Sequence, residues 1–110
     1  MKVPYYLNLK GEELLNGPLP IDVYPDKEAA FAHMAQEYVD VILSNKKAHK
    51  KTLIITPLGP VGQYKYLVKL INEQRIDLHD VTFLNMDEYM ADETHLISPN
   101  DPISFHHIMY

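Results

Sequence analysis

Cysteine is absent from all 110 residues, which excludes disulfide bonds and thiolate metal sites. Also absent is any apolar run near the roughly 20 residues that a membrane-spanning helix needs. Residues 1–6 lack the apolar core of a secretory signal. By elimination, these absences predict a cytoplasmic protein that has no membrane partner.

Basic residues are fewer than acidic ones, 10 against 15, so the formal net charge is −5. This balance argues against a surface that binds nucleic acid. Four of the lysines nevertheless crowd into one run, at positions 46, 47, 50 and 51. Such a run could attract a phosphate or an acidic partner. We interpret it instead as a solvated helix end, because lysines there complement the negative end of the helix dipole.

A histidine pair at metal-ligand spacing is also missing. His106 and His107 are adjacent and so face different directions on a helix, and His95 falls in a polar loop. No His-x-x-x-His pair occurs. We therefore expect no metal site and no cofactor, and interpret these histidines as solvated or locally hydrogen-bonded.

What is present is an alternation of strand and helix patterns. Residues 21–24 alternate apolar and polar side chains, as a half-buried strand does, and residues 52–56 form an apolar run typical of a strand covered on both faces. Residues 81–84 are the third expected strand. Between them lie two helical patterns, from 27 to about 45 and from 62 onward, whose apolar faces carry Phe31, Ala35, Tyr38, Ile42, Tyr64, Leu67, Val68 and Ile71.

The element order is β-α-β-α-β, with a third helix expected to open at Asp101 and Pro102. Strands that alternate with helices predict an α/β fold with a parallel sheet and right-handed crossovers. Residues 1–20 are an irregular N-terminal extension to this unit, which we assign to residues 21–110. A sheet of three strands has two unpaired edges. We therefore expect the unit to be part of a larger three-layer domain and predict self-association into a homo-oligomer.

Two polar segments are expected at the carboxyl edge of this sheet, where α/β folds bind ligands. The turn 57–62 joins a strand to a helix, so free N–H groups and the helix dipole could hold an anion there. Gly59 and Gly62 would let the backbone approach a ligand closely. Asp87 follows the next strand, and the pair of segments suits an acid or base working on a phosphorylated metabolite. A tight turn and a helix cap would explain the two segments equally well.

Residues 85–89 read Asn-Met-Asp-Glu-Tyr, which matches the signature of the glucosamine-6-phosphate isomerase/deaminase family without a change. Tyr64 and Lys65 lie at that family's distance before the signature. Residues 101–106 are similar to a Pro-x-Ser-aromatic segment that follows it. From Ile21 onward, the chain thus resembles the N-terminal portion of that family.

The resemblance implies a Rossmann-like α/β domain that converts glucosamine 6-phosphate to fructose 6-phosphate and ammonia through an enediol-type intermediate. It implies that Asp87 is the base that moves a proton between the first two sugar carbons. The only partner it implies is a small-molecule sugar phosphate. Contacts with this substrate are expected from Thr56, Leu58, Gly59, Gly62 and Glu88.

The sequence departs from the family in two places. The family's phosphate loop, Thr-Gly-Gly/Ser-Thr-Pro, is replaced by Thr-Pro-Leu-Gly-Pro at residues 56–60, which retains only Thr56 and Pro60 of that pattern. The departure implies either a different substrate or a phosphate bound through other backbone groups. The second-half motif that opens the sugar ring is missing, as are later basic residues that hold the phosphate. The 110-residue chain itself is therefore expected to be inactive or very poor. The alternatives are a hydrolase of the 6-phosphogluconolactonase type and a non-catalytic module that binds phosphosugars.

Overall fold

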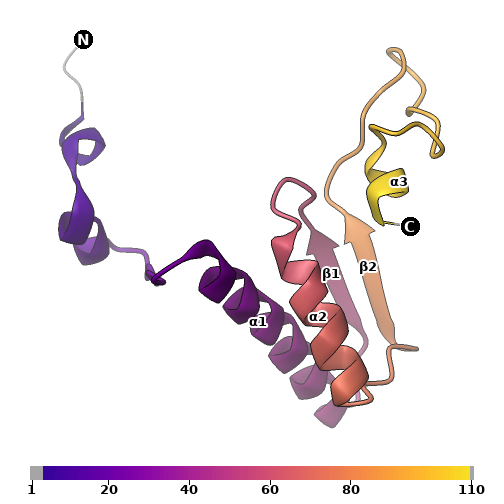
Figure 1. Cartoon of the computed structure of the whole chain (residues 1–110), viewed down its shortest axis with the longest axis horizontal. Helices are drawn as coiled ribbons and strands as arrows, with labels where there is room; N and C mark the ends of the chain where they lie inside the picture. The colour runs from indigo at the N-terminus through magenta and orange to yellow at the C-terminus, as the bar shows by residue number, and fades with distance from the viewer. Residues whose placement is uncertain (1–3, 110) are drawn as a thin grey trace.

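The computed structural model describes residues 4–109. Within this part, two short 3-10 helices precede three α-helices and two β-strands (Figure 1). In chain order the elements are η1 (Tyr5–Asn8), η2 (Gly11–Asn16), α1 (Lys27–Lys47), β1 (Thr52–Thr56), α2 (Gly62–Glu73), β2 (Val81–Asn85) and α3 (Phe105–Met109). No helix in this described part is both long and apolar enough to span a membrane.

β1 and β2 form a two-stranded parallel sheet, with Thr52 opposite Val81 and Thr56 opposite Asn85. Parallel neighbours cannot be joined by a tight hairpin, and α2 supplies the crossover between them. The predicted α/β class is confirmed, and both strands lie where the sequence predicts them. β2 runs one residue further than expected, to Asn85.

The strand expected at residues 21–24 is not formed, so the described order is α-β-α-β-α after the 3-10 helices. These residues lie on an N-terminal arm that leads away from the start of α1, well apart from the sheet (Figure 1). Ile21 and Val23 are 48% and 73% exposed. An alternating sequence forms a strand only where a neighbouring edge pairs with its backbone, and the arm lies beside no such edge. The arm also raises the radius of gyration to 18.1 Å, against about 13 Å for a compact domain near this size.

The long helix α1 begins where the sequence predicts. Asp26 Oδ1 accepts a hydrogen bond from the Ala29 N–H at 2.8 Å, which caps the first turn. The last turn carries Lys46 and Lys47, near the negative end of the helix dipole. Lys46 is not simply solvated, because its Nζ lies 2.6 Å from Asp80 Oδ1 and the two side chains are only 23% and 22% exposed. The expected solvated helix end is therefore wrong at Lys46, which ties α1 to the residue before β2.

The hydrophobic core lies between α1 and α2. Ala35 and Val39 of α1 are fully buried and pack with Leu67 of α2, which is 3% exposed. Ala35 and Leu67 fall on the apolar faces that the helical spacing predicts, and Val39 lies beside the predicted face of α1. Because α2 begins directly after the turn 57–61, its contact with α1 also fixes the position of that turn.

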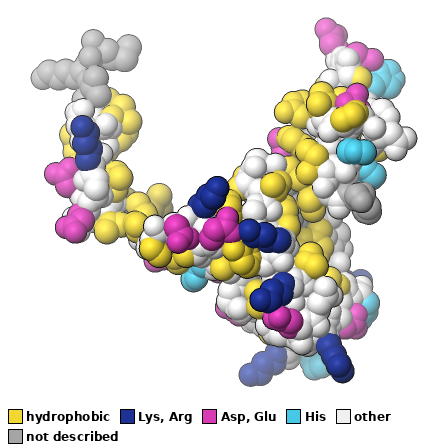
Figure 2. All heavy atoms as spheres, in the orientation of Figure 1, with side chains coloured by type: hydrophobic (Ala, Val, Ile, Leu, Met, Phe, Trp, Pro, Cys, Tyr) yellow, Lys and Arg dark blue, Asp and Glu magenta, His cyan; other side chains and the backbone are white. Residues whose placement is uncertain are grey.

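The helices cover only one face of the sheet. Ile54 and Thr56 of β1 are buried, whereas Leu53 and Ile55 are 61% and 54% exposed. The expectation that β1 is covered on both faces is therefore wrong for the described part of the chain. Leu84 pairs with Ile55 and is 53% exposed. Leu53, Ile55 and Leu84 thus form an apolar outer face, and Figure 2 shows further hydrophobic side chains along the arm.

Candidate functional site

The carboxyl ends of β1 and β2 meet at one edge of the sheet. Thr56 and Asn85 are paired, and the Met86 N–H donates to the Thr56 carbonyl oxygen at 3.0 Å. The turn 57–61 and the segment 86–89 therefore start side by side. Sequence reasoning predicts this juxtaposition if the two parallel strands are neighbours, and they are.

Thr56 faces the inside of the molecule and is fully buried. Its hydroxyl donates to the Leu84 carbonyl oxygen at 3.2 Å and lies 3.5 Å from Asn85 Oδ1. The hydroxyl thus ties the two strands together at their carboxyl ends. Thr56 is one of the residues expected to contact substrate, and the structure places its hydroxyl in a contact between strands.

The turn between β1 and α2 is held by the first turn of α2. Gln63 Nε2 donates to the Pro60 carbonyl oxygen at 2.6 Å, and the Tyr64 hydroxyl donates to the Pro57 carbonyl oxygen at 2.5 Å. Leu58, expected to contact substrate, is only 5% exposed. Gly59 is exposed, and a β-carbon there would meet no atom within 4 Å. A ligand at this turn would therefore meet the backbone of Gly59 before the side chain of Leu58.

Gly62 stands in a more crowded place than Gly59. A β-carbon at Gly62 would lie 2.2 Å from Cε2 of Phe31, far inside van der Waals contact. The missing side chain therefore lets α2 begin directly against Phe31 of α1. The structure gives Gly62 a packing role, and its expected contact with substrate stays a prediction.

Sequence reasoning does not single out Gln63, yet its side chain is fully buried beside the turn. Nε2 is bonded to Pro60, whereas Oε1 has no hydrogen-bond partner among the described residues. A buried acceptor without a donor is costly, so a water molecule or a ligand hydroxyl is its natural partner. Spacing is the signal that finds this residue, since Gln63 lies four positions before Leu67 and shares the buried face of α2.

Asp87, the expected base, is exposed on the segment that leaves β2. No hydrogen bond or ion pair of its side chain is found within residues 4–109. Met86 beside it is 62% exposed. The carboxylate is thus open to a small molecule at the sheet edge, as a base must be when it takes a proton from a bound substrate.

The Glu88 carboxylate, by contrast, is occupied by the chain itself. Oε1 accepts hydrogen bonds from the N–H groups of Tyr89 and Phe105, each at 2.9 Å. Oε2 accepts from the Ser104 hydroxyl at 2.8 Å and from the His106 N–H at 2.9 Å. The structure thus brings Glu88 to the start of α3, and its expected contact with substrate stays a prediction.

These contacts set the ionisation of Glu88. Burial raises the pKa of the carboxyl, but hydrogen bonds from the backbone of His106, Phe105 and Tyr89 and from the Ser104 hydroxyl outweigh it, and the pKa falls from 4.5 to about 2. Because the folded-state pKa is depressed, the carboxylate stabilises the fold fully above its ordinary pKa. That contribution is lost as the pH falls through about 2. At neutral pH Glu88 is therefore an acceptor and not a proton donor.

The helix α3 begins at Phe105, not at Pro102 as the sequence predicts. Asp101 Oδ1 accepts from the Ile103 N–H at 3.1 Å, and the Asp101 carbonyl oxygen accepts from the Ser104 N–H at 2.9 Å. These bonds close a turn before any helix can start. The Ser104 hydroxyl then accepts from the His106 N–H at 3.1 Å and caps α3. Asp101 therefore bonds within its own turn, and Ser104 takes the capping position.

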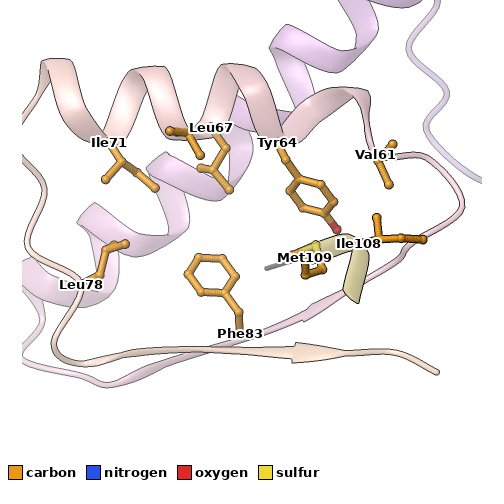
Figure 3. Close-up of a pocket in the computed structure, with 9 residues that line it drawn as sticks. Val61, Tyr64, Leu67, Ile71, Leu78, Phe83, Ile108 and Met109 are labelled. Carbon is orange, nitrogen blue, oxygen red and sulfur yellow. The ribbon is translucent and has the colours of Figure 1, made fainter. Parts of the chain in front are cut away.

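Two hollows lie beside the sheet in the described part of the chain, and Asp87 lines neither. One of about 430 Å³ lies between α2, β2 and α3, and Figure 3 shows Tyr64, Leu67 and Phe83 directed into it. Its lining is apolar apart from the tyrosine hydroxyl, so it does not suit a phosphate. The other, of about 470 Å³, is lined by Asn85, Glu88, Leu96, Ile97, Ser98, Pro99 and His106. No group of three or more His, Asp or Glu able to hold a metal lies within residues 4–109.

Several curated proteins named glucosamine-6-phosphate deaminase are similar to this chain. The one from Thermoanaerobacter sp. (strain X514) is 27% identical over 82 residues, which cover 73% of this chain and 30% of the relative. The one from Borrelia garinii subsp. bavariensis is 32% identical over 80 residues, 71% of this chain and 27% of the relative. The one from Borreliella burgdorferi (strain ZS7) is 36% identical over 55 residues, 50% of this chain and 19% of the relative.

The chain spans less than a third of the length of these curated relatives. No family model matches it, and no solved structure does. The similarity nevertheless covers 71–73% of this chain in the two longer alignments. We conclude that the chain is a distant relative of proteins named glucosamine-6-phosphate deaminase.

Proposed function

We propose that this chain carries part of a sugar-phosphate site of the glucosamine-6-phosphate isomerase/deaminase type, with Asp87 as its base. One observation carries the proposal: β1 and β2 are parallel neighbours, so the turn 57–61 and the exposed Asp87 leave the same edge of the sheet. The shared name of the similar proteins supports it. Phosphorylated sugars are intracellular metabolites, so we place the proposed reaction in the cytoplasm.

The chemistry asked of Asp87 is a proton transfer. On the open-chain amino sugar, its carboxylate would take the proton from carbon 2 and return it to carbon 1 through an enediol-type intermediate, while one proton of the amino group passes to the oxygen of carbon 1. Carbon 2 is then left as an imine, which water hydrolyses to a ketone and ammonia. A positioned carboxylate suits the first step. The groups that open the sugar ring are proposed to come from outside these 110 residues.

The phosphate is proposed to bind at the turn 57–61. Gly59 is exposed there, and α2, a helix of 12 residues, begins directly after the turn. Lys65 does not add its charge to the turn, because its Nζ pairs with Glu28 Oε2 at 2.6 Å. The Thr56 hydroxyl is engaged between the strands. The turn therefore offers backbone N–H groups alone, and the affinity of this chain for phosphate is expected to be weak.

We further propose that residues 21–110 are one part of a larger Rossmann-like, three-layer domain. A strand at 21–24 would then pair beside β1, because strands joined by a right-handed helical crossover such as α1 commonly neighbour each other. The outer face of Leu53, Ile55 and Leu84 would be covered by the third layer, as parallel sheets require.

In the 110-residue chain alone, this uncovered sheet is expected to drive self-association into a homo-oligomer. Size-exclusion chromatography with light scattering should show a mass that rises with concentration. Ile55→Lys should shift the equilibrium toward the monomer, because it places a charge on the outer face. A compact wild-type monomer at high concentration would count against both the homo-oligomer and the need for a third layer.

A second candidate is a non-catalytic module that binds phosphosugars. It is favoured by the turn 57–61, which has no hydroxyl side chain of its own, and by the buried Thr56 hydroxyl. Such a module would bind the sugar through the turn without using Asp87. No observation favours a lactonase, and the similar proteins carry another name.

Asp87→Asn is expected to weaken the binding of glucosamine 6-phosphate to this chain about tenfold, because it removes the charge from a hydrogen bond to the sugar. The affinity is measured by titration calorimetry or by amide NMR. Inorganic phosphate serves as the control ligand, and its affinity should not change. Equal affinity of wild type and variant for the sugar would favour the non-catalytic module, whereas loss of both ligands would indicate a folding defect.

A further inference from the structure

The Glu88 carboxylate joins two segments that are far apart in sequence. Its partners Ser104, Phe105 and His106 lie 16 to 18 residues downstream. The same two segments meet a second time where the rings of Tyr89 and Phe105 lie at a centroid distance of 4.9 Å, tilted by 45° to each other. Glu88 therefore does more than close a local turn.

Asp92, by contrast, makes only local contacts. It lies in the polar segment between β2 and α3, and its Oδ1 accepts hydrogen bonds from the N–H groups of Thr94 and His95 at 2.8 and 2.9 Å. Its pKa is also lowered to about 2, by these hydrogen bonds and those of the Thr94 and His95 side chains. All its partners lie within three residues, so it organises only its own turn.

α3 is short, and its position depends on contacts at both ends. A helix of five residues cannot hold itself together in water. At its start, Glu88 and Ser104 satisfy N–H groups that would otherwise lack acceptors. At its end, Ile108 and Met109 line the same apolar hollow as Tyr64 and Phe83 (Figure 3). α3 thus bonds to Glu88 at its start and faces Tyr64 and Phe83 across the hollow at its end.

The backbone around Asp87 has few other ties. The Met86 N–H bonds to the Thr56 carbonyl oxygen at 3.0 Å, and the Tyr89 carbonyl oxygen accepts from the Ile97 N–H at 2.8 Å. Between these two bonds, the Glu88 side chain and the contact of the Tyr89 ring with Phe105 connect the backbone to α3 among the described residues. Glu88 therefore restrains the backbone just after Asp87, whereas the bond from Met86 to Thr56 restrains it just before Asp87.

We propose that Glu88 is the positioning residue of this site: its hydrogen bonds to the start of α3 fix the backbone of residues 86–89 and so hold Asp87 in place. This inference rests on the proposed function in that Asp87 is the group to be positioned. It assigns Glu88 no contact with substrate. The inference gives the two adjacent acidic residues different roles, because Asp87 is exposed whereas Glu88 is partly buried and bonded to the start of α3.

The test compares Glu88→Gln with Asp92→Asn in the 110-residue chain. Both variants remove one carboxylate that accepts several hydrogen bonds, but only Glu88 reaches α3. In Glu88→Gln, amide exchange at Phe105 and His106 should accelerate about tenfold or more, because the side chain loses its charge and one of its two acceptor oxygens becomes an NH2 donor. The ¹⁵N order parameters of residues 86–89 should fall in the same variant from rigid values toward about 0.6. Asp92→Asn should change neither.

The two measurements separate positioning from mere capping. Faster exchange at α3 with unchanged order at residues 86–89 would make Glu88 a helix cap only and overturn the proposal. If Glu88→Gln fails to fold, Ser104→Ala replaces it, since it removes the hydroxyl that donates to Glu88 and caps α3 but leaves the Glu88 charge and its bonds from the Phe105 and His106 N–H groups. A smaller loss of order at residues 86–89 is then expected, and no loss would overturn the proposal. Neither measurement uses a ligand. If the wild-type chain does not bind glucosamine 6-phosphate, that result contradicts the proposed function and leaves the positioning role of Glu88 unaffected.

Discussion

Leu67→Ala is expected to lower the free energy of unfolding by about 2–5 kcal/mol. Leu67 is 3% exposed and packs against Ala35 and Val39, so a shorter side chain leaves a cavity where α1 meets α2. Domains of ordinary stability have only about 5–15 kcal/mol in total. The variant should therefore lose a large share of its stability. Urea unfolding followed by circular dichroism measures the change.

Val68→Ala is the matched control for Leu67→Ala. Val68 is the next residue of α2 and is 56% exposed, so its truncation should change the free energy of unfolding by less than about 1 kcal/mol. Similar losses in the two variants would show that the contact between α1 and α2 is not the core. The position of the turn 57–61 would then need another explanation.

Gly62→Ala is expected to destabilise the chain by about 1–3 kcal/mol. The new β-carbon would lie 2.2 Å from the Phe31 ring, so either the ring or the start of α2 has to move. Alanine favours a helix over glycine by up to about 1 kcal/mol, which opposes the clash but does not outweigh it. Thermal unfolding without any ligand measures the effect, because the clash exists whether or not a ligand binds.

Gly59→Ala provides the comparison, since a β-carbon there meets nothing within 4 Å. Its stability should stay near that of wild type. Adding Phe31→Ala to Gly62→Ala should cost less than the sum of the two single changes, because the two residues share one space. If Gly62→Ala is as stable as wild type, the packing role is wrong and the role in ligand binding becomes the better explanation.

The helices α1 and α2 could be predicted from the sequence because their signals are local. Apolar residues recur at helical spacing over several turns, and Asp26 supplies a cap directly before α1. α3 lacks that redundancy. Its start depends on whether Asp101 bonds to a helix or to its own turn, and the pattern Asp-Pro is compatible with both.

Strands are harder to predict because each depends on a neighbour. Residues 21–24 have the alternation of a strand, yet no edge lies beside them in the structure. Residues 52–56 have the continuous apolar run of a fully covered strand, yet Leu53 and Ile55 are exposed. A sequence pattern shows which side chains of a segment are apolar enough to be buried, but whether they are buried depends on the elements that pack beside the segment.

The place of the candidate site could be predicted from the sequence, but its contacts could not. The turn 57–61 and Asp87 each follow a strand, and the carboxyl ends of parallel strands lie at one edge of the sheet. It does not show that the Thr56 hydroxyl turns inward or that Phe31 fills the space beside Gly62. The bonds from Glu88 to residues 16 to 18 positions away are equally invisible in a linear pattern.

An amide NMR titration of the wild-type chain with glucosamine 6-phosphate shows whether the edge where β1 and β2 end binds a sugar phosphate. We expect shifts in two separate segments, residues 56–63 and residues 85–89, with little change elsewhere. Shifts in the first segment alone would support phosphate binding without the Asp87 half of the site. A well-folded sample in which neither segment shifts would contradict the claim that this sheet edge binds a sugar phosphate.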